Sequence, residues 1–172
     1  WEVVTSNPSR YSSTPPVSRV TTLTLLNNAE VYVGSTRAGF SGQKLFADST
    51  GSLSDTAEPV TLEVNSLNGS GTFFLRTYLE DGADKSDSIH VTGSANGTFK
   101  LAVKADGRDL QSAPAVQQTQ SYLARVEGNA GNETFELAST QYGLFIDQGL
   151  YVYKLASEPR TVNGGKEWYL VR

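Results

Sequence analysis

The residues with the strongest potential for catalysis lie close together, between Asp87 and His90. His90 is the single histidine of the chain, so a histidine-based triad or a histidine zinc site must use it. Asp87 and Ser88 supply the other residue types of an acyl-transfer triad. Near neighbours on a strand point to alternate faces, so these three side chains cannot form the relay. One histidine also gives no zinc-ligand spacing. We expect His90 to be a surface residue of a strand.

A second candidate site is the acidic segment LEDGADKSD, which contains Glu80, Asp81, Asp84 and Asp87. Carboxylate clusters are typical of calcium sites, but this segment lacks the alternating aspartates and the final glutamate of an EF-hand loop. Two carboxylates can also catalyse glycoside hydrolysis, and that depends on a separation in space that a sequence does not give. We expect a solvated acidic loop, with no metal and no cofactor.

Two further features could serve sugar chemistry. Asn-x-Ser/Thr sequons begin at Asn68, Asn96 and Asn132. The chain also has aromatic residues that could line a sugar-binding groove, namely Phe73, Phe99, Tyr151, Tyr153 and Trp168. However, tight turns select Asn-Gly for its backbone freedom, and alternate aromatic residues more often fill a core or a cap. We expect turns at the sequons and core or cap positions for the aromatic residues.

The overall composition narrows the class of protein. The 172 residues carry a formal net charge of −4, with scattered basic residues, whereas a nucleic-acid partner needs a basic face. The absence of cysteine excludes thiol chemistry and cysteine metal sites. No apolar run approaches the roughly 20 residues of a membrane helix, and no signal peptide is evident. Gly, Ser, Thr and Asn dominate the polar residues, which indicates an all-β protein. Since the chain lacks Met and begins at Trp1, we expect a fragment of a longer protein.

Apolar and polar residues alternate along most of the chain, as in strands with one buried face. Residues 1–20 contain three of the six prolines and predict an irregular or extended lead-in. Strand segments follow, and in residues 72–80 Phe73 and Leu75 share the apolar face while Arg76 lies on the opposite one. The segments 150–157 and 166–172 predict a terminal hairpin with a long loop, which would cover an open sheet edge.

An internal repeat is the most informative feature. Asn-Gly followed by Thr-Phe occurs in residues 66–77 and again in residues 94–103. Aligning Phe73 with Phe99 gives an offset of 26 residues, and aligning Val64 with Val91 gives 27. A strand–turn–strand unit at this period fits a β-solenoid, whose coils stack their inward apolar residues. It also fits a β-sandwich with regular hairpins. The periodicity leaves both architectures open.

A series of motifs over residues 55–172 resembles a known family. The matching positions are Leu67, Gly69, Gly71 and Phe73; Asp87, Ile89, Val91, Thr92, Gly93, Ala95 and Gly97; Phe135 and Leu137; Gly149, Tyr151, Tyr153 and Leu155; and Trp168, Tyr169 and Leu170. In this order and spacing they resemble the autochaperone region of pertactin-like (type V) autotransporters of Gram-negative bacteria. That region is the C-terminal end of the secreted passenger.

The resemblance implies an all-β fold, a right-handed parallel β-helix (solenoid) with a C-terminal capping hairpin. It implies N-terminal coils and lead-in over residues 1–54 and an autochaperone region over 55–172, with the hairpin at about 150–172, in one continuous unit. The implied function is not enzymatic. It is nucleation of passenger folding and support of secretion across the outer membrane to the cell surface. The implied partners are the upstream passenger β-helix and a downstream outer-membrane β-barrel translocator. A surface adhesin module that binds a host protein or glycan is the alternative.

The resemblance also gives roles to particular residues. The expected folding nucleus and core stack consists of Leu62, Val64, Leu67, Phe73, Leu75, Ile89, Val91, Phe99, Leu101 and Val103. The expected cap consists of Phe135, Leu137, Tyr151, Tyr153, Leu155, Trp168 and Leu170.

Overall fold

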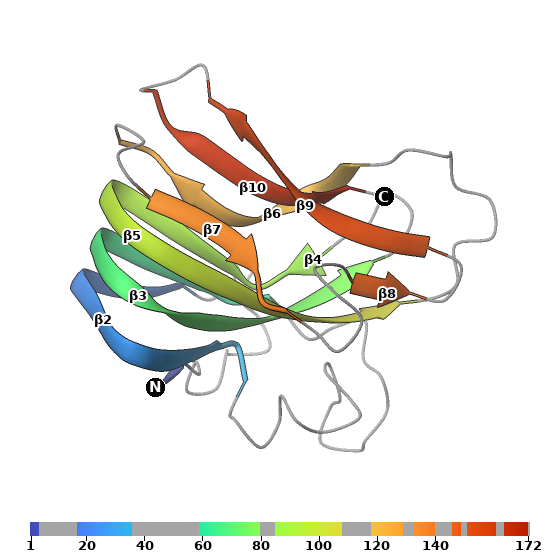
Figure 1. Ribbon diagram of the computed structural model, residues 1–172, viewed down its shortest axis with the longest axis horizontal. Helices are drawn as coiled ribbons and strands as arrows, with labels where there is room; N and C mark the ends of the chain where they lie inside the picture. Colours follow the sequence, from blue (N-terminus) through green and yellow to red (C-terminus); the bar gives the residue numbers. More distant parts are fainter. Residues whose placement is uncertain are drawn as a thin grey trace, which may run out of the picture.

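Figure 1 shows a computed structural model of the chain, which describes residues 1–3, 17–35, 59–79, 85–107, 118–128, 133–139, 146–148, 151–160 and 164–171. Within these ranges there are ten β-strands and no helix of the length and apolarity that a membrane span requires. The strands are β1 (Glu2–Val3), β2 (Val17–Val33), β3 (Thr61–Leu79), β4 (Lys85–Ser86), β5 (Ser88–Gly107), β6 (Gln118–Val126), β7 (Glu133–Leu137), β8 (Ile146–Gln148), β9 (Tyr151–Pro159) and β10 (Lys166–Val171).

The three long strands β2, β3 and β5 form successive parallel coils of a solenoid, stacked as in Figure 1. Each long strand bends about its middle, so that one strand supplies two legs of its coil. Leu62 pairs with Ile89 on the first leg, and Phe73 pairs with Leu101 on the second. The side chains that alternate inward along both legs therefore stack on their equivalents in the next coil.

Asparagine and glycine form the bends of these strands. In β2 the bend contains Asn27 and Asn28, both with positive φ (49° and 62°). In β3 and β5 it contains Gly69 (φ 94°) and Gly97 (φ 130°), which pair with each other. Glycine adopts positive φ without strain, and asparagine tolerates the left-handed region better than most other residues. The turns expected at the first two sequons are thus present, since Asn68 and Asn96 directly precede these glycines.

The offset of 26 residues that the Thr-Phe repeat suggests is wrong. The coils align their Asn-Gly bends, so Gly69 pairs with Gly97 and Phe99 pairs with Gly71, an offset of 28. The offset of 27 holds only before the bend, at Val64 and Val91, because one extra residue enters the ladder there. A shift of two residues leaves every side chain on its face, so the repeat identified the inward face but not the register.

The C-terminal end of the solenoid is built differently from the coils. β6 and β7 pair in parallel with the two legs of β5, through residues 89–91 and 97–101. β10 then pairs antiparallel with β6, β9 with β10, and β8 with β9, which completes the order β1-β2-β3-β5-β6-β10-β9-β8. The antiparallel strands β9 and β10 are the expected hairpin. The prediction of an all-β parallel β-helix with a C-terminal capping hairpin is confirmed.

The lead-in contains more regular structure than the prolines suggested. β1 pairs in parallel with the end of β2, and β2 begins at Val17, three residues before the end of the expected irregular stretch. The acidic residues Glu80, Asp81 and Asp84 and the third sequon at Asn132 lie outside the described residues.

A substitution at Gly97 tests whether the close contact between the stacked bends requires glycine. A Cβ atom at this position would overlap the carbonyl oxygen of Gly69 in the preceding coil, and φ is positive. We expect Gly97→Ala to lower the free energy of unfolding by about 2–4 kcal/mol. Urea unfolding followed by fluorescence measures this, and Asn96→Ala, a change at the exposed neighbouring residue, is the control. Equal stability of the two variants would contradict the steric account.

Candidate functional site

The residues expected to form the folding nucleus meet in one continuous core. Phe73, Phe99 and Phe135, from β3, β5 and β7, form an aromatic row whose ring centroids are 6.1 Å and 5.2 Å apart. The row ends on Trp168 of β10, whose ring lies 4.8 Å from that of Phe135 at an interplanar angle of 59°. These distances and tilts are those of favourable aromatic pairs. The row therefore links three coils to the capping hairpin.

Burial of the other expected core residues follows the same pattern. Phe73 and Phe99 are inaccessible to solvent, and so are the residues that flank them on the inward faces, namely Leu62, Val64, Leu67, Leu75, Ile89, Val91 and Leu101. Val103 is half-buried and packs against this core. Burying one large apolar side chain contributes about 1.5–3 kcal/mol, so the core is the main source of stability of the coils.

The expected cap residues close the C-terminal end of the core. Trp168 and Leu170 of β10 and Tyr153 of β9 are buried with Phe135 and Leu137 of β7. Leu155 is half-buried against them. The side chain of Tyr151 lies outside the described residues. Aromatic residues that could have lined a sugar-binding groove are thus core residues wherever their side chains are described.

An ion pair lies buried at the end of β3. The Asp87 carboxylate, inaccessible to solvent, accepts hydrogen bonds from the Arg76 side chain at 2.7 Å and 2.9 Å. It also accepts bonds from the backbone N–H groups of Arg76 (3.0 Å) and Val60 (2.8 Å). Val60 lies just before β3 and Arg76 near its end, so one carboxylate ties the start of a coil to its finish. Gly34, after β2, packs directly against the pair, with no room for a side chain.

The sequence interpretation was wrong for both members of this pair. Asp87 was expected in a solvated acidic loop and Arg76 on the exposed face of its strand, whereas Arg76 is only 7% exposed. Strand alternation fails near the end of β3 because Leu75, Arg76 and Thr77 are all buried. Thr77 bonds to Ser86 of β4, the strand that pairs antiparallel with this part of β3. Only the position of Asp87 at the head of the second motif indicated its importance.

His90 belongs to a cluster of charged side chains on the outer face of the sheet. We call this the outer ionic cluster; its members are Arg19, Glu63, His90, Arg125, Glu127, Arg160 and Glu167. His90 Nε2 lies 3.1 Å from Glu127 Oε1, and Nδ1 lies 3.9 Å from Glu63 Oε2. Ser88 instead bonds to Thr61 at 3.0 Å. His90 is therefore a half-buried residue of the outer face, and Asp87, Ser88 and His90 have separate partners.

The carboxyl group of Glu127, a member of this cluster, has a lowered pKa. Burial raises the pKa of its carboxyl, but hydrogen bonds and positive charge from Arg160 and His90 outweigh burial, so the pKa lies below its ordinary value of 4.5. Arg160, which follows β9, bonds to Glu127 and also to Glu167 of β10 at 3.1 Å. No group of three or more His, Cys, Asp or Glu residues within the described ranges could hold a metal ion.

Comparison with known proteins identifies the family. The sequence model of the pertactin family matches residues 21–172. This chain belongs to the pertactin family. It is an autotransporter passenger region, and autotransporters are exported through the outer membrane to the bacterial cell surface or beyond it.

Several curated autotransporters are similar to this pertactin-family chain. The BrkA autotransporter of Bordetella pertussis is 35% identical over 101 residues, 59% of this chain and 9% of BrkA. The probable autotransporter YpjA of Escherichia coli is 31% identical over 146 residues, 85% of this chain and 8% of YpjA. The adhesin/invasin TibA of Escherichia coli is 31% identical over 113 residues, 66% of this chain and 10% of TibA. The chain thus spans a tenth or less of each of these relatives.

The contribution of the buried ion pair between Arg76 and Asp87 to stability can be tested by mutation. Arg76→Ala leaves the Asp87 carboxylate buried without its charged partner, which costs about 3–5 kcal/mol. Arg19→Ala is the matched control, because it removes an arginine–carboxylate pair (2.9 Å) whose arginine side chain is 69% exposed, and such pairs contribute at most about 1 kcal/mol. Urea unfolding of both variants measures the difference. Similar losses in the two would show that burial of Asp87 is unimportant.

The depressed pKa of Glu127 predicts a pH dependence. A carboxyl with a lower pKa in the folded state than in the unfolded state stabilises the fold above the unfolded value, about 4.5. That contribution disappears as the pH falls through the folded value. We expect Glu127→Gln to reduce the loss of stability between about pH 5 and pH 3. Unfolding curves across this range measure it, with Glu136→Gln, at an exposed carboxylate of β7, as control. An unchanged slope in Glu127→Gln would refute it.

Proposed function

We propose that this chain is the C-terminal autochaperone module of an autotransporter passenger, which nucleates passenger folding and assists secretion across the outer membrane. The observation that carries the proposal is the aromatic row of Phe73, Phe99, Phe135 and Trp168, which continues from the coils into the capping hairpin. A passenger that crosses the outer membrane C-terminus first needs a part that folds early and stays folded. A core closed at its C-terminal end is suited to that role.

The energetics of a solenoid support this role. The first coils form without a template and are costly, whereas each later coil adds its apolar residues to an existing stack. Long-range pairing of the kind seen between β3 and β5 is slow to nucleate. A module that has already formed these pairs offers a template for the coils N-terminal to it. We assign this module to residues 55–172 and assign residues 1–54 to the first coils that it templates.

The same proposal makes the module non-enzymatic. Asp87 is saturated by Arg76 and Val60, Ser88 is bonded to Thr61, and His90 lies between Glu63 and Glu127. In each case the polar groups have structural partners rather than a shared substrate position. The partners that the proposal requires are the upstream β-helix of the passenger and the outer-membrane translocator of the same protein.

The test compares two tryptophans that differ in burial. Trp168 is 3% exposed and ends the aromatic row, and Trp1 is 55% exposed. We expect Trp168→Ala and Phe99→Ala to lower the free energy of unfolding by about 3–5 kcal/mol. In cells that produce the whole autotransporter, both variants should reduce the amount of passenger that reaches the surface, measured by protease shaving. Trp1→Ala should change neither quantity. Normal display of destabilised variants would overturn the chaperone role and leave the fold intact.

Direct binding of a host protein or glycan is the second candidate. TibA is an adhesin/invasin by name, and three exposed large apolar residues come from the N-terminal part of the chain: Trp1 just before β1, and Val17 and Leu26 in β2. Exposed apolar residues favour an interaction surface where they gather into one patch. Binding of the purified chain to host cells, reduced by Leu26→Ser but not by Trp168→Ala, would favour this candidate over the autochaperone.

A further inference from the structure

A row of charged side chains crosses the outer face of the sheet from the first coil to the capping hairpin. Its members are paired directly in the strand ladders, each with the next, in the order Arg19, Glu63, His90, Arg125 and Glu167. They come from β2, β3, β5, β6 and β10. Directly paired residues on one face are the closest side-chain neighbours in a sheet. A change of strand register therefore changes which charges lie opposite each other.

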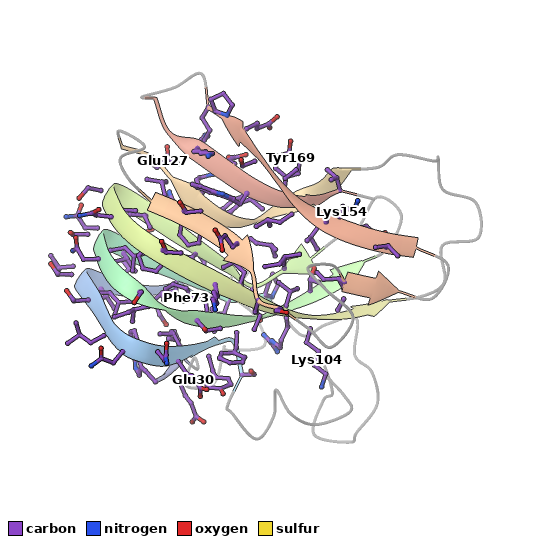
Figure 2. The ribbon with its side chains drawn as sticks, viewed as in Figure 1. Glu30, Phe73, Lys104, Glu127, Lys154 and Tyr169 are labelled. Carbon is purple, nitrogen blue, oxygen red and sulfur yellow. The ribbon has the colours of Figure 1, made fainter. Side chains whose placement is uncertain are left out.

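The contacts are densest where the hairpin meets the coils. Arg125 of β6 contacts Glu167 of β10 at 2.6 Å, and its Nε is 4.0 Å from Glu127. Arg160 bridges Glu127 and Glu167 from the turn side of the hairpin. In Figure 2 the labelled Glu127 and Tyr169 mark this end of the sheet. At the junction between β6 and β10, Arg125 and Arg160 each lie close to both carboxylates, those of Glu127 and Glu167.

The apolar core does not by itself fix how β10 docks on β6. Trp168 and Leu170 point inward because side chains alternate, and a slip of two residues would keep them pointing inward. Such a slip in one direction places Trp168 opposite Val126 instead of Ala124, and both are buried apolar residues. Burial of the hairpin therefore leaves at least one competing register open.

The charges distinguish these registers. In the observed register Glu167 lies opposite Arg125. The slip that brings Trp168 to Val126 would bring Glu167 opposite Glu127, and like charges directly opposite are destabilising. The slip in the other direction would bring Glu167 opposite Leu123, which is buried and uncharged. Each alternative register removes the contact between Glu167 and Arg125, and one adds a repulsion.

We propose that the outer ionic cluster selects the docking register of the capping hairpin, with Glu167 and Arg125 as the attractive pair and Glu127 as the residue that rejects the slipped register. These are positioning residues, since they act through the placement of Trp168 on Phe135. Partly exposed ion pairs contribute little to stability, but attraction in one arrangement and repulsion in another give specificity. The inference does not depend on the proposed chaperone role, because it concerns the hairpin within this chain.

The absence of cysteine from the chain allows a direct test by disulfide trapping. Val171 pairs with Gln118 in the observed register, so Gln118→Cys with Val171→Cys reports that register. Gln120→Cys with Val171→Cys reports the slip that pairs Glu167 with Glu127. Each reporter pair is introduced into the otherwise unchanged chain, into E167R and into E167R/R125E. After oxidation with oxidised glutathione, the cross-linked fractions are measured by gel mobility and mass spectrometry.

We expect the unchanged chain to cross-link almost only through the Gln118 reporter. E167R places like charges at Arg125 and opposite charges at Glu127, so the ratio of native to slipped cross-links should fall about tenfold or more. In E167R/R125E the arginine at position 167 meets a glutamate in both registers, so the ratio should rise above that of E167R and stay below that of the unchanged chain. If E167R merely detaches the hairpin, both cross-links disappear, and the double variant must still restore the native one. A ratio of native to slipped cross-links that is unchanged in E167R, or that is no higher in E167R/R125E than in E167R, overturns the proposal.

Discussion

The closure of the β3 coil depends on one buried carboxylate, that of Asp87. Asp87 accepts four hydrogen bonds from Arg76 and Val60, and these residues lie at opposite ends of the same coil. A charge with no exposure to solvent is tolerated only when its partners are all in place. Asp87 also precedes β5, the next coil, so its position ties two successive coils together. The stack of inward residues is regular because both ends of the coil are held.

Core and surface contribute differently to this architecture. The row from Phe73 to Trp168 removes large apolar surfaces from water, which is the dominant stabilising term. The row of charges on the outer face is partly exposed, and its pairs add little to the free energy of unfolding. However, a slip by two residues leaves inward side chains facing inward, whereas it changes which charges of the outer row lie opposite each other. Stability and register are therefore supplied by opposite faces of the same strands.

The parts of the fold that could be predicted from the sequence are those that depend on the alternation of apolar and polar residues along a strand. Phe73, Phe99 and Trp168 could be placed in the core, and the terminal hairpin could be expected, because alternation and turn residues are local signals. The offset of 28 residues could not be obtained from the Thr-Phe repeat, since the alternation of apolar and polar residues is the same after a shift of two residues. The burial of Arg76 and Asp87 could not be predicted either, because it arises where Gly34 packs against the pair and β4 pairs with the end of β3.

Because alternation does not distinguish registers that differ by two residues, an apolar interior alone does not fix the register of a β-helix. Within the coils, the bends of Gly69 and Gly97 must coincide, since a bend stacked on a straight leg leaves inward residues without neighbours. The capping hairpin pairs differently, because β10 is short, runs antiparallel to β6 and has register shifts between Trp168 and Tyr169 and between Tyr169 and Val171. Inward burial alone distinguishes its registers poorly, because Ala124 and Val126 are both buried apolar residues of β6. In the proposed account, the ion pair of Arg125 and Glu167 on the outward face adds the discrimination that inward burial lacks.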